Sequence, residues 1–269
     1  MVAGPAAAEA VAIARRNRGL RVGLHLALVD APPMCDPARI PQLVDPHGRL
    51  RSDLAALGAR LAFSARAREE LRAEIEAQFA AFAATGLALD HVNAHRHFHL
   101  HPYVGALILD IGPRYGMRSL RVPLEPSALF RDSGSLHFER TLARVYARRL
   151  ARRVRGAGVA TADHVFGIAW SGAWDARRLR FVLERLPDGF VEIYLHPATR
   201  DAFPGAAPGY RHREELAALL DPACAKALDG GRHARGGYAD ALADEIDRGL
   251  AADRFTRPMG RPPSASKAP

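Results

Sequence analysis

Apolar residues recur along the chain in short runs that predict β-strands. The runs are RVGLHLAL from Arg21, LDHVNAH from Leu89, SLRVPL from Ser119, ADHVFGIAW from Ala162 and FVEIYLH from Phe190. Stretches with helical spacing lie between them, and this alternation is typical of parallel βα units. The 269 residues suit a single α/β domain, because barrels of about this size fold as one unit.

The clearest predicted helix covers residues 65–84. Its apolar positions recur at helical spacing, namely Leu71, Ile75, Phe79 and Phe82. This spacing places them on one face, which indicates packing against a core. Ser64 suits the N-cap, and Gly86 suits the stop. A second helix is expected over residues 102–115, because Pro102 fits a first helical turn.

Two segments lack such spacing. Residues 31–50 are rich in Pro and Asp and predict a long loop after a strand, where loops commonly shape active sites. Residues 257–269 are expected to form a disordered tail. This leaves a single domain over residues 1–256.

The chain carries a formal net charge of +9, and arginine supplies nearly all of the positive charge. The arginines fall in separate segments rather than in one stripe with base-reading residues, so a nucleic-acid binder is the less favoured alternative. An acidic lipid surface is a partner that this charge still allows. Cys35 and Cys224 follow no metal-ligand or redox spacing, which favours a reducing compartment. No apolar run reaches membrane-spanning length, so we expect a cytoplasmic protein.

Five of the 12 histidines lie within residues 91–101. In an extended backbone they share one face with Asn93. These residues are His91, His95, His97, His99 and His101. Neutral imidazole readily binds a divalent metal, but neighbours on one strand face are about 6.5–7 Å apart, so only one or two rings are expected to bind one ion. The others would orient ligands, move protons or contact substrate, and a solvated strand end is the alternative.

His25 and His196 stand in similar settings. His25 interrupts an apolar strand, and His196 closes another strand just before Pro197. The carboxyl ends of parallel strands meet at one edge of a sheet, where catalytic groups collect. We therefore expect both histidines to join the histidine run in one site. A satisfied core histidine is the alternative for each.

Four motifs carry a resemblance: GLHLAL at Gly23, HVNAHRHFHLHP at His91, LRVPLEP at Leu120 and EIYLHPATR at Glu192. Together they resemble the YdjC-like carbohydrate deacetylases, the family of the chitooligosaccharide deacetylases. With GIAWSGAW, they are most similar to the branch associated with hopanoid biosynthesis. The resemblance implies an α/β fold with a distorted (β/α) barrel, a divalent metal ion (Mg²⁺ or Zn²⁺), and removal of an N-acetyl group from an amino sugar.

For this branch, the resemblance implies an N-acetylglucosaminyl hopanoid as substrate. A glycolipid of this kind would be met at the inner face of the membrane, so peripheral contact with that surface is expected. A dimer is the assembly considered, and no nucleic-acid partner is expected.

Carried over by motif, the resemblance assigns the metal ligands to His25 and His95. His196 is the candidate general acid for the departing amine. Candidate substrate contacts, or neighbours of the ligands, are Asn93, His97, His99, Arg121 and Trp170. Arg121 is equally suited to a structural ion pair. Trp170 and Trp174 either stack on a sugar ring or pack in the core.

The resemblance also implies ligands that this sequence lacks. Family members begin with a strand ending in a TADDFG-type motif, whose two aspartates supply a metal ligand and the general base. Met1 aligns within the family's second strand, so we expect the first strand, its helix and this aspartate pair to be absent. The segment TADHVFG at Thr161 is similar to this motif but lies on a different predicted strand. We therefore interpret Asp163 as a decoy, a residue that does not take the place of the missing aspartates. Either the start codon is assigned too late, or the protein lacks a working metal site and an intact barrel. An inactive metal-binding protein is the alternative function.

Overall fold

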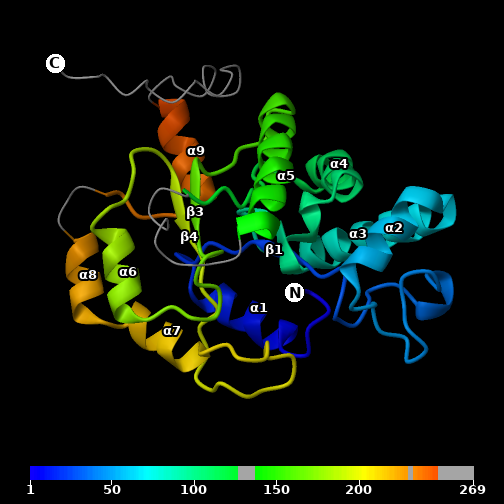
Figure 1. Cartoon of the computed structure of the whole chain (residues 1–269), viewed down its shortest axis with the longest axis horizontal. Helices are drawn as coiled ribbons and strands as arrows, with labels where there is room; N and C mark the ends of the chain where they lie inside the picture. Colours follow the sequence, from blue (N-terminus) through cyan, green and yellow to red (C-terminus); the bar gives the residue numbers. More distant parts are fainter. Residues whose placement is uncertain (127–136, 230–232, 248–269) are drawn as a thin grey trace.

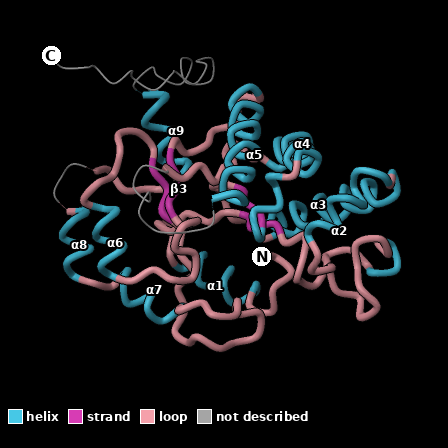
Figure 2. Tube along the Cα trace, viewed as in Figure 1, coloured by secondary structure: helices cyan, strands magenta, loops and turns pink. Residues whose placement is uncertain are grey.

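A computed structural model describes residues 1–126, 137–229 and 233–247 of the chain. Helices and long loops surround short central strands (Figure 2). The predicted tail, residues 257–269, and the predicted domain boundary at residue 256 lie outside the described residues.

Four short strands form two parallel pairs. β1 (Leu24–Leu26) pairs with β2 (Val92–Ala94), and β3 (His164–Phe166) pairs with β4 (Val191–Ile193). Each strand lies inside a run that the sequence predicts, although each ladder is only three residues long.

The segment that begins at Ser119 joins the two pairs. Its Leu120 bridges Val92 of β2, and Ser119 itself bridges Ala160 ahead of β3. All five predicted strand runs therefore lie in parallel, which confirms the α/β expectation. Within the described residues no backbone ladder joins β1 to β4, so the barrel is not confirmed. The absence of a first strand stays a prediction.

Helices lie on both sides of these strands. α6, α7 and α8 gather on one side, and α2 to α5 gather on the other (Figure 1). The described helices are α1 (Ala7–Arg16), α2 (Leu54–Phe63), α3 (Ala65–Ala84), α4 (Pro102–Ile111), α5 (His137–Gly156), α6 (Ala176–Leu183), α7 (His212–Leu219), α8 (Pro222–Leu228) and α9 (Tyr238–Asp247). Short 3₁₀ segments are η1 (Pro37–Arg39), η2 (His95–Leu100) and η3 (Gly112–Tyr115).

Helix α3 matches its prediction at both ends. The Ser64 hydroxyl accepts a hydrogen bond from the Ala67 amide at 3.1 Å. Gly86 follows the helix with a φ of 70°, a left-handed conformation that glycine adopts without strain. Helix α4 begins at Pro102, as predicted, and η3 occupies the rest of the span expected to be helical. The long predicted loop at residues 31–50 contains only η1 and a single bridge.

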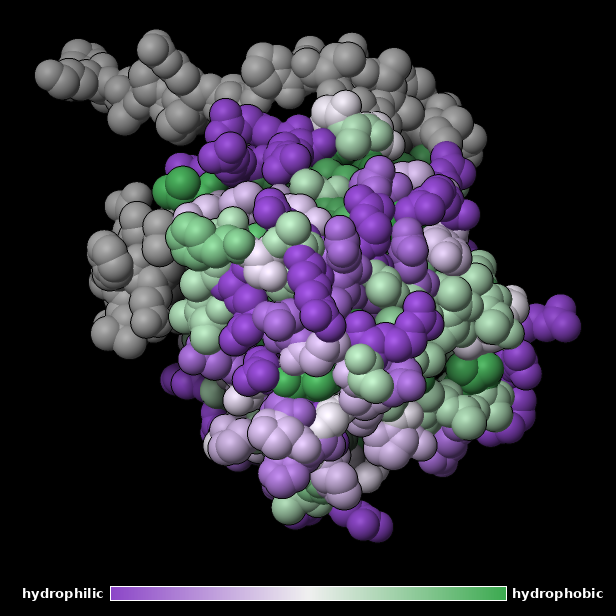
Figure 3. All heavy atoms as spheres, turned by 90° about the vertical axis from the view of Figure 1, so that its right-hand side faces the viewer, coloured by the Kyte–Doolittle hydropathy of each residue, from purple (hydrophilic) through white to green (hydrophobic). Residues whose placement is uncertain are grey.

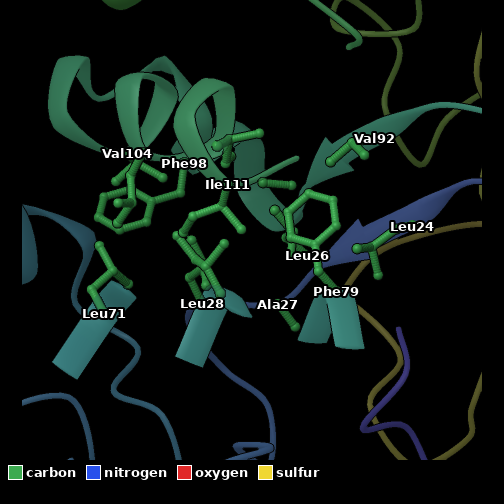
Figure 4. Packing of buried hydrophobic residues seen from close by; sticks show 14 of the residues in the cluster. Leu24, Leu26, Ala27, Leu28, Leu71, Phe79, Val92, Phe98, Val104 and Ile111 are labelled. Atoms are coloured by element: carbon green, nitrogen blue, oxygen red, sulfur yellow. The ribbon is translucent and has the colours of Figure 1, made fainter. Parts of the chain in front are cut away.

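The largest apolar cluster lies between the first strand pair and helices α3 and α4. Leu24 and Leu26 from β1 and Val92 from β2 lie beside Phe79 of α3 and Ile111 of α4 (Figure 4). A second cluster joins β3 to α6, α7 and α8. A third, smaller cluster contains Val165 of β3, Tyr194 and Tyr238.

Helix α9 is anchored at the amino ends of the strands. The Asp90 carboxylate, just before β2, accepts hydrogen bonds from the backbone amides of Tyr238 and Ala239 at 3.2 and 2.9 Å. The Tyr238 ring stacks on His91 with 4.7 Å between centroids. Its hydroxyl donates to Glu192 at 2.6 Å. These contacts fix α9 to β2 and β4, although Asp90 and Tyr238 are 148 positions apart in the sequence.

Hydrophilic side chains cover much of the face seen in Figure 3, with smaller apolar areas between them. Among the described residues, no helix is both long enough and apolar enough to cross a membrane. Cys35 and Cys224 are free thiols.

We expect Asp90→Ala to lower the free energy of unfolding by about 1–3 kcal/mol, because it leaves the buried amide of Tyr238 without its acceptor. Denaturant unfolding followed by circular dichroism measures this change. Asp110→Ala is the matched control, since Asp110 makes a surface ion pair with Arg72 and exposed pairs contribute little. Equal loss of stability in both variants would contradict the role given to Asp90.

Candidate active site

The histidine run does not continue the strand that precedes it. β2 ends at Ala94, and residues 95–100 form η2. Within this segment Arg96 and His97 have φ values of 50° and 54°. The prediction that the five rings share one face is therefore wrong, because that alternation requires an extended backbone. Left-handed residues other than glycine are strained, and such strain is typical of functional sites.

His25 and Asn93 lie opposite each other on β1 and β2. His25 Nδ1 donates a hydrogen bond to the Asn93 side-chain oxygen, which leaves Nε2 with its lone pair free to bind a ligand. The Asn93 amide group contacts His91 Nε2 at 3.2 Å. Burial lowers the pKa of His25 to about 3, so this ring is neutral at pH 7.

His95 lies beside His25, with 5.7 Å between ring centroids. Burial also lowers the pKa of His95. Its Nε2 is 3.9 Å from the carboxylate of Asp30, but that carboxylate pairs with Arg96 at 3.0 Å. The structure therefore brings together the two predicted metal ligands.

The donor set at this place fits a divalent metal in type. Two neutral imidazoles can each offer a lone pair, as zinc and related ions require. A catalytic zinc site normally has three protein ligands, and the described residues contain no group of three suitable side chains. The site is therefore incomplete within the part of the chain that the structure describes.

His97, Tyr194 and Arg121 form a second group next to this pair. His97 Nε2 is 3.1 Å from the Tyr194 hydroxyl. The Arg121 guanidinium lies 4.8 Å from the centre of the Tyr194 ring, and its Nε donates to Glu192 at 2.8 Å. The side chains of Arg121 and Glu192 are only 13% and 12% exposed. Arg121 thus makes the structural ion pair that the sequence left as one of two alternatives.

His99 lies beneath the site rather than in it. Its side chain is fully buried, and its Nε2 donates to the Arg121 carbonyl at 2.9 Å. Burial lowers its pKa well below the usual value for histidine. A direct substrate contact, one of the two roles predicted for His99, is wrong for this conformation because no part of the ring is exposed.

His196 follows β4, and both burial and nearby charged groups affect its pKa. Its pKa is lowered to about 4, chiefly by burial and then by His212, Arg121 and His95. The ring makes edge contacts with Tyr194 at 5.7 Å and with Tyr210 at 5.0 Å between centroids. Tyr194 therefore lies in contact with both His196 and His97, which connects His196 to the group beside the predicted ligands.

The tryptophans belong to the second core. Trp174 is fully buried, so it has no face free for a sugar ring. Trp170 contacts Trp174 edge-on at 5.3 Å, and the Arg178 guanidinium lies 5.5 Å from its ring. The core-packing alternative is correct for Trp174. A sugar contact by the partly exposed Trp170 stays a prediction.

Asp163 lies at the other end of the strands. Its carboxylate accepts a hydrogen bond from the Phe190 amide at 2.9 Å, just before β3 and β4 begin. This position agrees with the interpretation of TADHVFG as a decoy.

Sequence reasoning missed four polar residues that define the site. They are Asp30, Glu192, Tyr194 and Glu215. A signal for two of them was present, because Glu192, Tyr194 and His196 alternate along one predicted strand. Asp30 and Glu215 lie in a loop and on a helix, where no periodicity marks them.

A model of the YdjC-like protein family matches residues 1–230 of the chain. The chain belongs to the YdjC-like family. Curated relatives include a carbohydrate deacetylase of Geobacillus stearothermophilus, 28% identical over 222 residues that cover 81% of this chain and 75% of the relative. The carbohydrate deacetylase of Mus musculus is 32% identical over 231 residues, or 78% and 71% of the two chains. The chitooligosaccharide deacetylase of Serratia marcescens is 32% identical over 109 residues, 40% and 41% of the two chains.

A solved structure of an Enterococcus faecalis V583 protein also matches this YdjC-like chain. That protein carries a provisional assignment as a cellobiose-phosphate cleavage protein. The TM-score is 0.67 with 21% sequence identity, and the match covers 89% of this chain and 85% of the other. This likeness supports the α/β fold.

The burial of neutral His99 makes stability depend on pH. Its folded pKa lies far below the ordinary value of about 6.5, so below pH 6.5 the unfolded state binds a proton that the folded state does not. We expect the free energy of unfolding to fall as the pH drops from 7 towards 5. One such histidine accounts for up to about 1.4 kcal/mol per pH unit.

Urea unfolding of the wild type and His99→Asn at pH 7.5, 6 and 5 measures this effect. The variant should be less stable at pH 7.5 and should show a shallower pH dependence, because Asn does not titrate. Parallel curves for the two proteins would contradict the assignment.

Proposed function

We propose that this chain is a carbohydrate N-deacetylase that hydrolyses the N-acetyl group of an amino sugar. Membership of the YdjC-like family and the names of its curated relatives support this activity. The observation that carries it is the pair of neutral imidazoles, His25 within β1 and His95 directly after β2, with ring centroids 5.7 Å apart. His196 follows β4, and its ring contacts Tyr194, whose hydroxyl lies 3.1 Å from His97.

Metal dependence is the finer part of this proposal. His25 and His95 would hold the ion, with Asn93 fixing the ring orientation of His25. A bound divalent ion would polarise the acetyl carbonyl and lower the pKa of a bound water.

His196 is the group that we assign to protonate the leaving amine. Because its pKa is lowered to about 4, the ring is neutral at pH 7 and must take up a proton before it can donate one. The contacts with Tyr194 and Tyr210 leave 39% of the His196 side chain exposed. This combination suits a residue that accepts and then delivers a proton within one turnover.

The substrate that we propose is an N-acetylglucosaminyl hopanoid. The resemblance of the motifs HVNAHRHFHLHP, GIAWSGAW and EIYLHPAT to the branch associated with hopanoid biosynthesis supports this assignment. The net charge of +9 is compatible with work at an acidic membrane surface.

Acetate release from N-acetylated chitooligosaccharides tests the activity. We expect His196→Ala to lower kcat by about 100- to 10,000-fold, as for the loss of a general acid. His47→Ala is the matched control, because His47 lies exposed in the loop at residues 31–50. A wild-type chain that releases no acetate under any metal condition would instead favour a metal-binding protein without enzymatic activity.

Metal binding is tested by titrating the metal-free protein with Zn²⁺ in a calorimeter. We expect His25→Ala and His95→Ala each to remove the binding, because either change leaves a single imidazole. His196→Ala and His47→Ala should retain it. Unchanged Zn²⁺ affinity in both ligand variants would place the ion elsewhere.

The lipid substrate is tested by comparing turnover of a glycosylated hopanoid in detergent with that of soluble N,N′-diacetylchitobiose. We expect the higher kcat/KM for the hopanoid, because the lipid portion adds binding energy. A higher value for chitobiose would contradict this substrate without affecting the deacetylase proposal.

A further inference from the structure

A buried carboxylate lies directly behind His196. Glu215 on helix α7 is 0% exposed, and a carboxylate in such a position is costly unless hydrogen bonds compensate for the lost water. One oxygen accepts a hydrogen bond from the His196 backbone amide. The other faces the Trp174 amide at 3.3 Å. Glu215 thus joins α7 to the end of β4 and to the loop before α6.

The same carboxylate is the nearest acid to the His196 ring. His196 Nδ1 is 3.9 Å from Glu215 Oε2. This nitrogen is buried and makes no hydrogen bond, although the ring as a whole is 39% exposed. The exposed edge is therefore the one that carries Nε2.

The backbone of His196 is held on both sides. Its amide is bound by Glu215, and its carbonyl accepts a hydrogen bond from His212 Nδ1. Both partners belong to α7, so the helix fixes the point from which the ring projects. A small movement of the ring is then enough to bring Nδ1 within hydrogen-bond distance of the carboxylate, and bonds of this kind often tighten only when substrate binds.

We propose that Glu215 is a positioning residue for His196, which keeps a proton on Nδ1 and leaves Nε2 as the atom that handles the transferred proton. This inference rests on the proposed deacetylase function. In the reaction, the water oxygen forms the new bond to the acetyl carbon and its proton passes to solvent, while Nε2 takes up a proton from solvent. The resulting imidazolium is stabilised by the carboxylate behind it. Nε2 then gives the proton to the amine nitrogen, which keeps the electron pair as the C–N bond breaks.

A structural role alone would give a different result, and two substrates separate the roles. An N-acetylated chitooligosaccharide has a poor leaving group that needs protonation. p-Nitrophenyl acetate releases a phenolate that leaves without a proton. The ester turnover of the His95→Ala variant is subtracted as background, so that only ester hydrolysis at the site is compared.

We expect Glu215→Gln to lower kcat on the amide by about 10- to 100-fold, with KM changed less than about twofold and ester turnover nearly unchanged. Glu215→Asp, which keeps the charge, should restore part of the amide activity. Glu214→Gln is the matched control, because Glu214 is exposed on the same helix and pairs with Arg211. Equal losses on amide and ester would show a structural role only, and no loss on either would also overturn the proposal.

A second measurement does not depend on activity or on the folding of a variant. Nitrogen-15 spectra of the wild-type imidazoles at pH 7.5, with the His196 signal assigned from His196→Gln, report which nitrogen carries the proton. We expect the Nδ1–H form. The Nε2–H form would overturn the role of Glu215, whether or not the chain deacetylates sugars. An Nδ1–H form in a chain that releases no acetate would instead reject the deacetylase function and leave the pairing intact.

Discussion

The ion pair between Arg121 and Glu192 connects the parts of this structure that meet beneath the site. Both side chains are almost fully buried, where an unpaired charge would be strongly destabilising. Arg121 brings the middle strand segment, and Glu192 brings β4. The Tyr194 ring lies against the guanidinium, and the Tyr238 hydroxyl binds the carboxylate. The positions of the site rings and of α9 therefore depend on this one neutralised pair.

Neutrality is the common property of the histidines above this pair. Burial is the main cause of the lowered pKa values of His25, His97 and His196, and the buried arginine opposes protonation further. Rings without charge can lie close together without repulsion, and each keeps one nitrogen as a potential acceptor. Exclusion of water and the positive charge of Arg121 thus keep several imidazoles neutral and able to bind a ligand.

The sequence predicts the helices of this fold better than it predicts the histidine segment. α3 is specified by local signals, since its cap, its apolar stripe and its terminal glycine lie within one short stretch. The same holds for the start of α4 at Pro102. In contrast, the alternation of the histidines suggests a strand, whereas the backbone turns left-handed at Arg96 and His97. No residue pattern near Arg96 predicts this change of backbone conformation. The side chain of Arg96 is held by Asp30 and by the Ser52 carbonyl, which are distant in the sequence.

The same distinction separates the site residues that were found from those that were missed. His25, His95 and His196 interrupt or close apolar strands, and a polar group there needs an explanation. Glu215 lies on a helix with ordinary amphipathic spacing, and only its contact with His196 across 19 positions gives it importance. Residues that act through another side chain leave little trace in a single sequence.

The anchoring of α9 also determines when, during synthesis, the contacts at the amino ends of the strands can form. Asp90 and Tyr238 are 148 positions apart, and Arg21 pairs with Asp240 across 219 positions. At about 5–20 residues per second, a ribosome needs roughly 7–30 s to make the chain between Asp90 and its partners. Throughout that interval α9 does not cover the amino ends of β2 and β4. The rings of His91 and Phe190, which Tyr238 contacts in the folded protein, are then open to other molecules. The nascent chain is therefore most vulnerable to misassociation just before its last described helix emerges.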